Sequence, residues 1–273
     1  MESFNLRTFQ LRLLDILTEV DVVCKKHDIC YYLVAGTLLG AVRHQGFIPW
    51  DDDIDIAMPR PDYERFIQHA KEWLPGQLEL VCPETVENYP FGFGKIQDAG
   101  TTLLERRKLQ YVGGVCIDVF PLDGISSNKI KQCWLFMQSH FWGRLLYFTC
   151  RDPYKHGRGL RSLPTLCCRF CFNRSYLQKK LKQVRTKYDF NSSEWVVDHD
   201  FPRSRAIAPK AVYGTPVSIS FEGKVFNGVS QPDALLSLVY GDYMVVPPHS
   251  KQKQHCYRIV KLDQSYRQYT GSL

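Results

Sequence analysis

Residues 47–60 read FIPWDDDIDIAMPR and place four aspartates, Asp51, Asp52, Asp53 and Asp55, within five positions. The whole chain carries a formal net charge of +7, so the run does not reflect a generally acidic composition. Alternate side chains of a β-strand point to the same face, so Asp-Ile-Asp-Ile predicts a strand with one carboxylate face and one isoleucine face. Such a strand fits inside a sheet in which other elements bury the isoleucines.

The two carboxylates on that predicted face repel each other, and a divalent cation relieves the repulsion. Magnesium prefers hard oxygen ligands together with phosphate oxygens. We therefore predict that Asp53 and Asp55 are metal ligands. Asp51 and Asp52 follow the turn at Pro49-Trp50, where we expect them to cap the loop or to contact outer-shell water or a donor molecule. The alternative is a solvated acidic loop, which the alternation with isoleucine disfavours.

A Gly36-Thr37 turn precedes this strand, between a short apolar strand (YYLVAG) and a helix (TLLGAVRHQG) that we expect to close at Gly46. Glycine lets a phosphate approach the backbone closely, and the hydroxyl and N–H groups at a helix start can bind it. A Gly-Thr turn followed by a strand with Asp-x-Asp resembles the layout of the nucleotidyltransferase superfamily that includes DNA polymerase β. That layout implies a third carboxylate on an adjacent strand.

Asp118, in GGVCIDVFPLDG, is the candidate for this third carboxylate. It is the one acid among Cys116, Ile117, Val119 and Phe120, and a charge in such surroundings is costly unless it is paired or bound to metal. We predict that Asp118 completes the metal site. A structural salt bridge to a buried arginine is the alternative.

The order of patterns predicts an α+β fold. The first 124 residues read as helix, strand, helix, strand, helix, strand, strand. We divide the chain into a nucleotidyltransferase-like catalytic core (1–125), a helical, basic and aromatic accessory lobe (126–215) and a C-terminal part (216–273). The last part contains a hairpin that turns at Glu222-Gly223 and a helix, and we expect all three parts to form one compact unit.

The N-terminal sequence and the cysteine content indicate the cellular compartment of the protein. The N-terminus lacks the pattern of a secretory signal, so the ten cysteines predict reduced thiols in a cytoplasmic protein. CCRFC, residues 167–171, could indicate zinc, but no second pair has ligand spacing. The most apolar run, residues 133–148, is shorter than the roughly 20 residues that a bilayer requires. For the accessory lobe we expect packing on the core, with peripheral contact to the inner face of an anionic membrane or to a lipid-linked glycan as the alternative.

Four segments, YLVAGTLLGAVRHQGFIPWDDDIDIAMPRPDYERF, KIQDAGTT, CIDVFPLDG and YGDYMVVPP, resemble the LicD family of bacterial phosphocholine transferases, related to fukutin and fukutin-related protein. The resemblance covers about residues 20–125 and 221–256. It implies transfer of phosphocholine, or a related phospho-alcohol, from a CDP-activated donor to a hydroxyl of teichoic acid, lipopolysaccharide or capsule, with release of CMP. CDP-choline is the favoured donor and Mg²⁺ the expected cofactor, with Mn²⁺ as its substitute. Asp53, Asp55 and Asp118 become the catalytic residues, and Asp118 additionally a base for the acceptor.

Donor-binding residues follow from the same comparison and from their chemistry. Arg43 and Lys95 are expected to hold the diphosphate, and His44 to donate a hydrogen bond in its neutral form. The full predicted donor-binding set is Gly36, Thr37, Arg43, His44, Trp50, Lys95, Asp242 and Tyr243, with Tyr240 and His255 assigned to the same pocket. For Trp50, Tyr89 and Phe91, core packing is the favoured interpretation, and stacking on cytosine or around a quaternary ammonium is the alternative.

Two other functions stay open at this point. One is a nucleotidyltransferase that adds a nucleoside monophosphate from a triphosphate to a sugar or other acceptor; no RNA-binding module follows the core, and no nucleic acid partner is expected. The other is a catalytically inactive protein that binds glycan or nucleotide. The presence of all three carboxylates and of the Gly-Thr turn disfavours the inactive protein.

Overall fold

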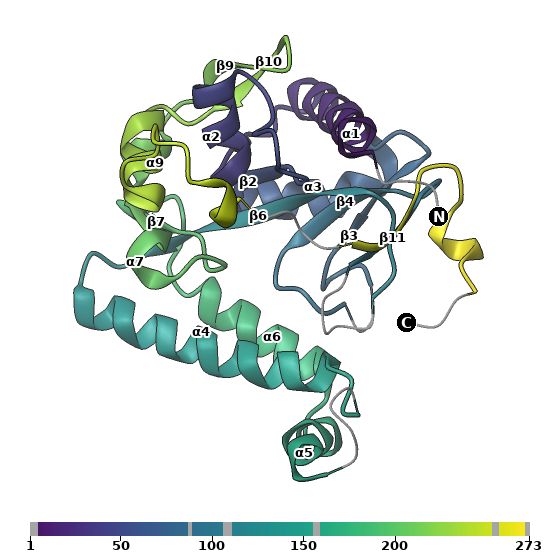
Figure 1. The fold of residues 1–273 in the computed structure, drawn as a ribbon. Helices are drawn as coiled ribbons and strands as arrows, with labels where there is room; N and C mark the ends of the chain where they lie inside the picture. Colours follow the sequence, from purple (N-terminus) through teal and green to yellow (C-terminus); the bar gives the residue numbers. More distant parts are fainter. Residues whose placement is uncertain (1–4, 87–88, 106–110, 155–158, 253–256, 271–273) are drawn as a thin grey trace.

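The computed structural model describes residues 5–86, 89–105, 111–154, 159–252 and 257–270 and shows helices arranged around a mixed β-sheet (Figure 1). The helices are α1 (Leu6–Lys26), α2 (Ala35–His44), α3 (Arg60–Trp73), α4 (Lys129–Cys150), α5 (Leu163–Cys171), α6 (Arg174–Arg185), α7 (Arg203–Ala206), α8 (Lys210–Tyr213) and α9 (Pro232–Tyr240), with short 3-10 turns η1 (Leu160–Ser162), η2 (His249–Lys251) and η3 (Tyr266–Gln268). The strands are β1 (Tyr32–Leu33), β2 (Asp55–Pro59), β3 (Leu78–Val81), β4 (Gly94–Asp98), β5 (Thr102–Glu105), β6 (Cys116–Ile125), β7 (Trp195–Val197), β8 (Ile207–Pro209), β9 (Val217–Phe221), β10 (Lys224–Gly228) and β11 (Tyr257–Lys261). The α+β class is confirmed.

The central sheet has the order β1-β2-β6-β4-β3, and β7 and β8 extend it from the end of β6. Strands β2 and β6 run parallel, whereas β1 with β2, β6 with β4, and β4 with β3 are antiparallel. Two parallel strands need a long crossover, and here α3, β3, β4 and β5 supply it. The aspartate strand β2 therefore lies next to β6 in the middle of the sheet.

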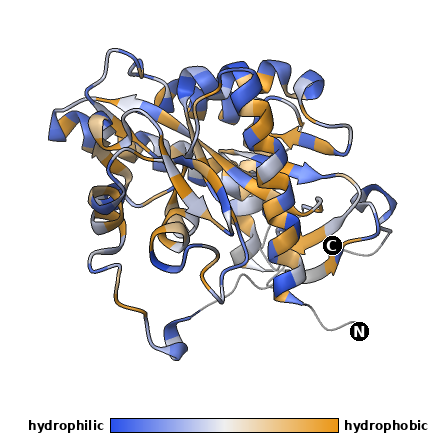
Figure 2. Cartoon of the chain, turned by 90° about the horizontal axis from the view of Figure 1, so that it is seen from above, coloured by the Kyte–Doolittle hydropathy of each residue, from blue (hydrophilic) through white to orange (hydrophobic). Residues whose placement is uncertain are grey.

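Helix α1 covers part of this sheet because one of its faces is apolar. Asn5 caps its N-terminus by accepting a hydrogen bond from the Thr8 N–H, as short polar residues do at this position. Leu13, Leu17 and Val20 are fully buried, and α1 contacts β4 and β6. Figure 2 shows hydrophobic and hydrophilic residues alternating around this helix, which begins near the N label.

Several predicted boundaries were wrong. Helix α2 begins at Ala35 rather than after Gly36, because the Val34 carbonyl already accepts the Leu38 N–H, and it ends at a left-handed Gln45 rather than at Gly46. The predicted order of elements also lacked β3 and treated β4 and β5 as one strand. A turn in which the Asp98 carboxylate accepts the Gly100 N–H separates them.

Strand β2 begins at Asp55, so Asp53 precedes the strand that was predicted to contain it. Strand β1 is two residues long and pairs with Ile56 and Ala57, and just beyond it the Val34 N–H donates to the Asp55 carbonyl over 3.2 Å. The predicted hairpin is confirmed: Glu222 and Gly223 both have positive φ, as the tight turn of a two-residue hairpin requires.

Residues 126–187 form a helical lobe in which α4 packs against α6 and α5 (Figure 1). Leu146, Cys150, Leu177 and Leu181 make a small apolar cluster of their own. No helix in the described part of the chain is long and apolar enough to cross a membrane. The nine cysteines that the structure describes are free thiols, and Cys256 lies outside the described residues.

Candidate active site

Three neighbouring strands bring charged residues into one row across the sheet. Asp55 of β2 and Asp118 of β6 are direct partners in the parallel pair, and Lys95 of β4 is the direct partner of Asp118 on its other side. Directly opposed residues in a sheet project from the same face, so the three side chains lie together. Residues 23 and 63 positions apart thus meet; the sequence predicted Asp118 on a strand adjacent to the aspartates but did not pair it with Lys95.

The isoleucine alternation predicted from the sequence is confirmed around this row. Ile54 and Ile56 are completely buried, whereas Asp53 and Asp55 are partly exposed. The Asp118 N–H also donates to the Ile54 carbonyl over 2.9 Å, which carries the pairing of β2 and β6 past the start of the strand. Asp53 is therefore held in extended backbone next to the row although it precedes β2.

The carboxylates of this region interact with one another. Burial raises the pKa of Asp55 well above its ordinary value, and the negative charges of Asp53, Asp118 and Asp51 raise that pKa further. The Lys95 ammonium opposes the increase. Asp51, which the sequence assigned to the loop, is thus one of the charges that act on Asp55, and the crowding of four aspartates was the signal that could have included it.

Lys95 is itself deeply buried, at 3% exposure. Its Nζ lies 2.6 Å from Asp118 Oδ1 and stands over the rings of Phe91 and Phe93, with 5.1 and 5.6 Å between Nζ and the ring centroids. The structural salt bridge considered for Asp118 therefore exists, with a lysine rather than an arginine. In this arrangement Lys95 compensates a carboxylate, whereas the sequence assigned it to the donor diphosphate.

The donor chemistry of the site fits a hard divalent cation, because carboxylates dominate it and repel one another. The geometry is less complete: among the described residues, no three His, Cys, Asp or Glu side chains are grouped so that they could hold a metal ion. Ligation by Asp53, Asp55 and Asp118 therefore stays a prediction, and it requires these side chains to converge further.

The Gly36-Thr37 turn supports the carboxylates from the α2 side. Thr37 Oγ1 accepts the Asp55 N–H over 2.8 Å, which fixes the start of α2 to the start of β2. A Cβ atom on Gly36 would lie 2.6 Å from Asp51 Oδ2, so only glycine lets this carboxylate approach. Ala35 has a φ of 50°, a left-handed conformation that costs energy for a residue with a side chain. The turn thus positions Asp51 and Asp55; its predicted contact with phosphate stays a prediction.

Arg43 and His44, in the last turn of α2, lie together with Trp50. Arg43 Nη1 donates to the Tyr243 carbonyl over 2.7 Å, and the ring of His44 meets Trp50 edge-on, with 6.4 Å between centroids. Burial, followed by the charge of Arg43, lowers the pKa of His44 below its ordinary value. His44 is therefore neutral at pH 7, as its predicted role as a neutral donor requires.

The residues of the YGDYM segment, at the end of α9, lie in different environments. Burial raises the pKa of Tyr240, and the charges of Asp55, Asp51 and Asp53 raise it further, which places this phenol near the carboxylates. Tyr243 instead donates its hydroxyl hydrogen bond to Asp233, and Asp242 is exposed. His255, assigned to the same pocket, lies outside the described residues.

Two predicted stacking residues belong to the core. Tyr89 and Phe91 are 1% and 7% exposed, and both rings pack edge-on against Tyr111. Core packing is therefore confirmed for both rings, and Phe91 additionally faces the Lys95 ammonium. Stacking on a nucleobase stays a prediction. Trp50 is half-buried and its ring meets His44 edge-on; its stacking on a ligand stays a prediction.

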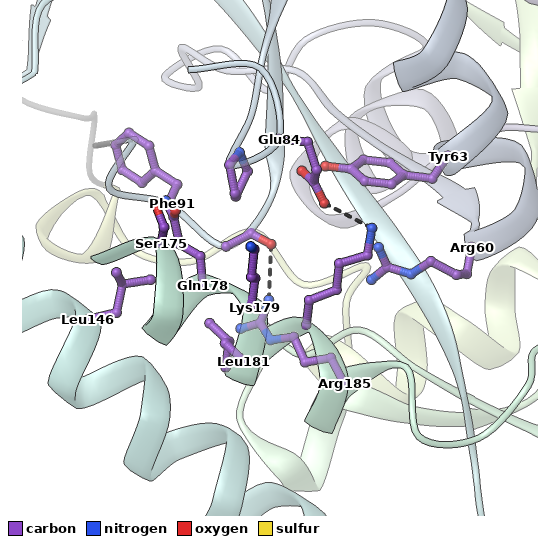
Figure 3. Close-up of a pocket in the computed structure, with 13 residues that line it drawn as sticks. Arg60, Tyr63, Glu84, Phe91, Leu146, Ser175, Gln178, Lys179, Leu181 and Arg185 are labelled. Carbon is purple, nitrogen blue, oxygen red and sulfur yellow. Dashed lines mark hydrogen bonds and ion pairs between the residues drawn. The ribbon is translucent and has the colours of Figure 1, made fainter. Parts of the chain in front are cut away.

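A cavity of ≈ 300 Å³ lies elsewhere, between α3, the segment before β4, and α6 (Figure 3). Arg60, Tyr63, Phe91, Lys182 and Arg185 are among its lining residues. Arg60 follows the last residue of β2 whereas Asp55 is its first, so the cavity opens ~13 Å along the strand from the carboxylate row.

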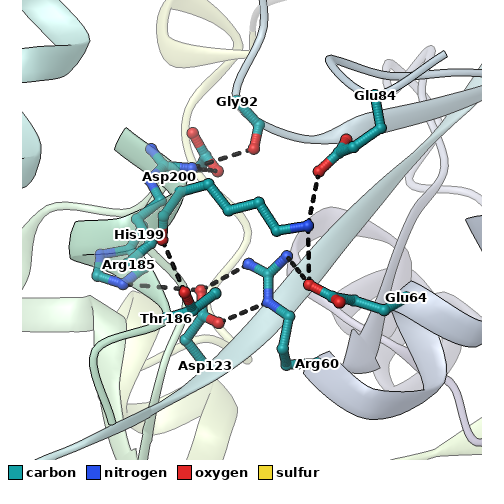
Figure 4. A network of polar contacts seen from close by, with 10 residues as sticks. Arg60, Glu64, Glu84, Gly92, Asp123, Arg185, Thr186, His199 and Asp200 are labelled. Carbon is teal, nitrogen blue, oxygen red and sulfur yellow. Dashed lines mark hydrogen bonds and ion pairs between the residues drawn. The ribbon is translucent and has the colours of Figure 1, made fainter. Parts of the chain in front are cut away.

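The charges that line this cavity form an ion-pair network (Figure 4). Arg60 makes two hydrogen bonds to the buried Asp123, of 2.7 and 2.8 Å. Lys182 reaches Glu64 and Glu84, and Arg185 reaches Asp200. These pairs connect the helical lobe to the sheet, and we assign the network a structural role.

Comparison with known proteins identifies the family of this chain. A lipopolysaccharide cholinephosphotransferase of Haemophilus influenzae, named LicD, is 31% identical over 265 residues, which are 93% of this chain and 97% of that protein. The chain belongs to the LicD family. The family model described as "LicD/FKTN/FKRP, nucleotidyltransferase domain" matches residues 28–145. This range contains the Gly36-Thr37 turn, the aspartate run, Lys95 and Asp118.

Two shorter matches fall on uncharacterized proteins. One from Rickettsia prowazekii is 46% identical over 110 residues, which are 40% of this chain and 33% of that protein. One from Rickettsia typhi is 45% identical over 58 residues, which are 21% of this chain and 19% of that protein. The family resemblance inferred from the four segments is confirmed.

Proposed function

We propose that this LicD-family chain transfers phosphocholine from CDP-choline to a hydroxyl group of a lipopolysaccharide-type glycan and releases CMP. The observation that carries the proposal is the row of Asp55, Asp118 and Lys95 on three neighbouring strands. The Haemophilus influenzae relative, named as a lipopolysaccharide cholinephosphotransferase, supports choline and the glycan. We also propose that the core has a nucleotidyltransferase-like fold, which the description of the matching family model supports.

The proposed step is an in-line displacement at the donor's distal phosphorus. The acceptor oxygen forms a bond to phosphorus, the bond from phosphorus to the bridging oxygen breaks, and CMP leaves with that electron pair. The hydroxyl proton passes to Asp118, which the Lys95 ammonium holds in place. Magnesium, or manganese, held by Asp53, Asp55 and Asp118, would neutralise charge on the attacking and leaving oxygens.

The residues around α2 would bind the rest of the donor. The Thr37 hydroxyl accepts the Asp55 N–H, and a phosphate would lie near this contact at the N-terminus of α2. Arg43, His44 and Trp50 form a group with one cation, one neutral imidazole and one aromatic ring, which suits a diphosphate next to a base or a quaternary ammonium. The Arg43 contact to the Tyr243 carbonyl ties the YGDYM segment to this group.

The proposal is tested by incubating the protein with Mg²⁺ and CDP-choline and measuring CMP, with and without lipopolysaccharide as acceptor. Asp55→Asn and Asp118→Asn should each lower the rate at least ~100-fold, because each removes a negative oxygen needed for charge compensation or proton transfer. Asp15→Asn, at an exposed position of α1, is the matched control and should keep the wild-type rate. Full activity in either site variant would refute the assignment.

Other donors separate the alternatives. CMP from CDP-ribitol or CDP-glycerol, but not from CDP-choline, would retain the transferase and change the alcohol. Pyrophosphate from CTP or ATP would instead support a nucleotidyltransferase. If no donor is turned over but CDP-choline binds, the inactive binding protein is correct. The cytoplasmic location stays a prediction.

A further inference from the structure

Positive charge is concentrated in the helical lobe, and the rest of the chain is net negative. Residues 126–187 contain 14 of the 35 Lys and Arg residues but only one of the 28 Asp and Glu residues, Asp152. Their formal charge is therefore +13, and the remaining chain, with the carboxylate row, is −6. A single-sign field of this size attracts extended anionic surfaces over distances of about one Debye length, ~10 Å.

The outer face of α4 is apolar and uncovered. Ile130, Trp134, Met137 and Phe141 are 80%, 55%, 55% and 56% exposed. Their spacing of four, three and four residues places them on one helix face. The buried residues of α4, Gln132, Leu135, Ser139, Leu146, Thr149 and Cys150, fall on the opposite face.

Further apolar side chains are exposed in the neighbouring part of the lobe. Leu160 of η1 and Phe170 of α5 are 84% and 93% exposed, and α5 contacts α4. Figure 1 shows α4 along one edge of the molecule, with α6 on its inner side and α5 projecting from the same end. Single exposed apolar residues are ordinary, but a helix-long row together with this second cluster marks an interaction surface.

Cationic side chains flank the apolar row. Lys129, Lys131 and Arg144 of α4 are exposed. A helix that combines aromatic and aliphatic residues on one face with lysine and arginine at its sides is suited to lie in the interface of an anionic bilayer, with the rings below the phosphates.

We propose that the outer face of α4, together with η1 and α5, docks on a bilayer that contains anionic phospholipid. A second copy of the chain is the other occupant that the apolar row could accept. Two-fold pairing along α4 would, however, bring two lobes of charge +13 face to face, which is strongly unfavourable. The anionic bilayer satisfies both the apolar row and the charge. The proposal does not depend on the proposed reaction.

Vesicle flotation with the full chain tests the proposal. We expect the protein to float with phosphatidylcholine vesicles that contain about 30% phosphatidylglycerol, and to bind pure phosphatidylcholine at least ~10-fold more weakly. The double variant Trp134→Gln/Phe141→Gln should bind anionic vesicles at least ~10-fold more weakly than wild type. Lys129→Gln/Lys131→Gln/Arg144→Gln should reduce binding and its dependence on salt.

A matched control distinguishes binding by this surface from nonspecific binding by any exposed apolar residue. Val22→Gln/Val225→Gln replaces apolar residues of equal exposure, 55% and 57%, on α1 and β10, and should float like wild type. Circular dichroism and unfolding midpoints should agree among all variants, because every substituted side chain is exposed. Absence of flotation with anionic vesicles would overturn the proposal. So would equal binding by the Trp134/Phe141 variant, or a dimer in solution that this variant dissociates.

Discussion

Replacing Lys95 by methionine should destabilise the protein far more than the loss of an ordinary lysine. The substitution nearly keeps the side-chain length and removes an ammonium that is 3% exposed and 2.6 Å from Asp118 Oδ1. Asp118, 14% exposed, would keep its negative charge beside Asp55 without the neighbouring cation. The variant therefore leaves an uncompensated carboxylate inside the sheet.

The geometry sets the size of the effect. At an effective dielectric constant near 20, Coulomb's law gives about 6 kcal/mol of attraction across 2.6 Å. Releasing the ammonium from its buried site returns part of this energy, because the wild-type fold must desolvate Lys95. We expect the free energy of unfolding to fall by about 3 kcal/mol, within the range of about 3–5 kcal/mol for breaking a buried pair from one side.

Urea unfolding followed by circular dichroism, in buffer with EDTA so that no divalent cation replaces the lost charge, measures this difference. Lys25→Met is the matched control. Lys25 also pairs with an aspartate, Asp21, at 2.7 Å, but its side chain is 57% exposed, and we expect a loss below ~1 kcal/mol. The two variants thus differ in burial rather than in bond length.

The double variant Lys95→Met/Asp118→Leu should recover most of the stability lost in Lys95→Met, because it removes the unpaired charge while filling its volume. It should have no transferase activity. A loss in Lys95→Met no larger than that in Lys25→Met, or a double variant no more stable than the single one, would show that burial does not set the value of this pair.

Three further outcomes follow from the structure. Arg60→Met removes both hydrogen bonds to a buried aspartate and should lower the free energy of unfolding by about 3 kcal/mol in urea titrations; less than ~1 kcal/mol would contradict the structural role of the network. His199 is buried, and burial together with nearby arginines lowers its pKa well below the ordinary value, so the unfolded chain takes up a proton below pH ~6.5 that the fold excludes. Stability should therefore fall between pH 7.5 and pH 5 by about 2 kcal/mol more in wild type than in His199→Gln, and parallel pH profiles would exclude this cause. Gly36→Ala puts a Cβ atom 2.6 Å from Asp51 Oδ2 and should slow CMP release at least ~10-fold, whereas Gly143→Ala, with nothing within 4 Å, should be neutral in the same assay.

The aspartate run shows which structural features a local sequence pattern can predict and which it cannot. The alternation of Asp with Ile correctly predicted which residues are buried, because burial of one strand face requires only a period of two. It did not predict that β2 begins at Asp55. That boundary depends on pairing with distant segments: β1 pairs with Ile56 and Ala57, and β6 pairs with Asp55 and the residues after it.

The sequence placed Asp118 on a strand adjacent to the aspartates, but it did not pair Asp118 with Lys95. Asp118 and Lys95 were each recognised as unusual, one as a lone acid among apolar residues and one as a lysine in a strand. That they pair with each other follows from the order β2-β6-β4 and its register, which depend on contacts between distant segments. Tyr89 and Phe91 show why two interpretations stayed open, because an aromatic residue has the same sequence signature in a core and in a binding site.

The sequence by itself determined the α+β class, the family, the buried face of the aspartate strand and the concentration of positive charge in residues 126–187, since each depends on residue type and short-range order. Only the tertiary structure decided that Lys95 neutralises Asp118, that Asp51 acts on Asp55, and that the apolar face of α4 is left uncovered. These are properties of side chains whose charge and exposure depend on which neighbours the folded chain brings to them.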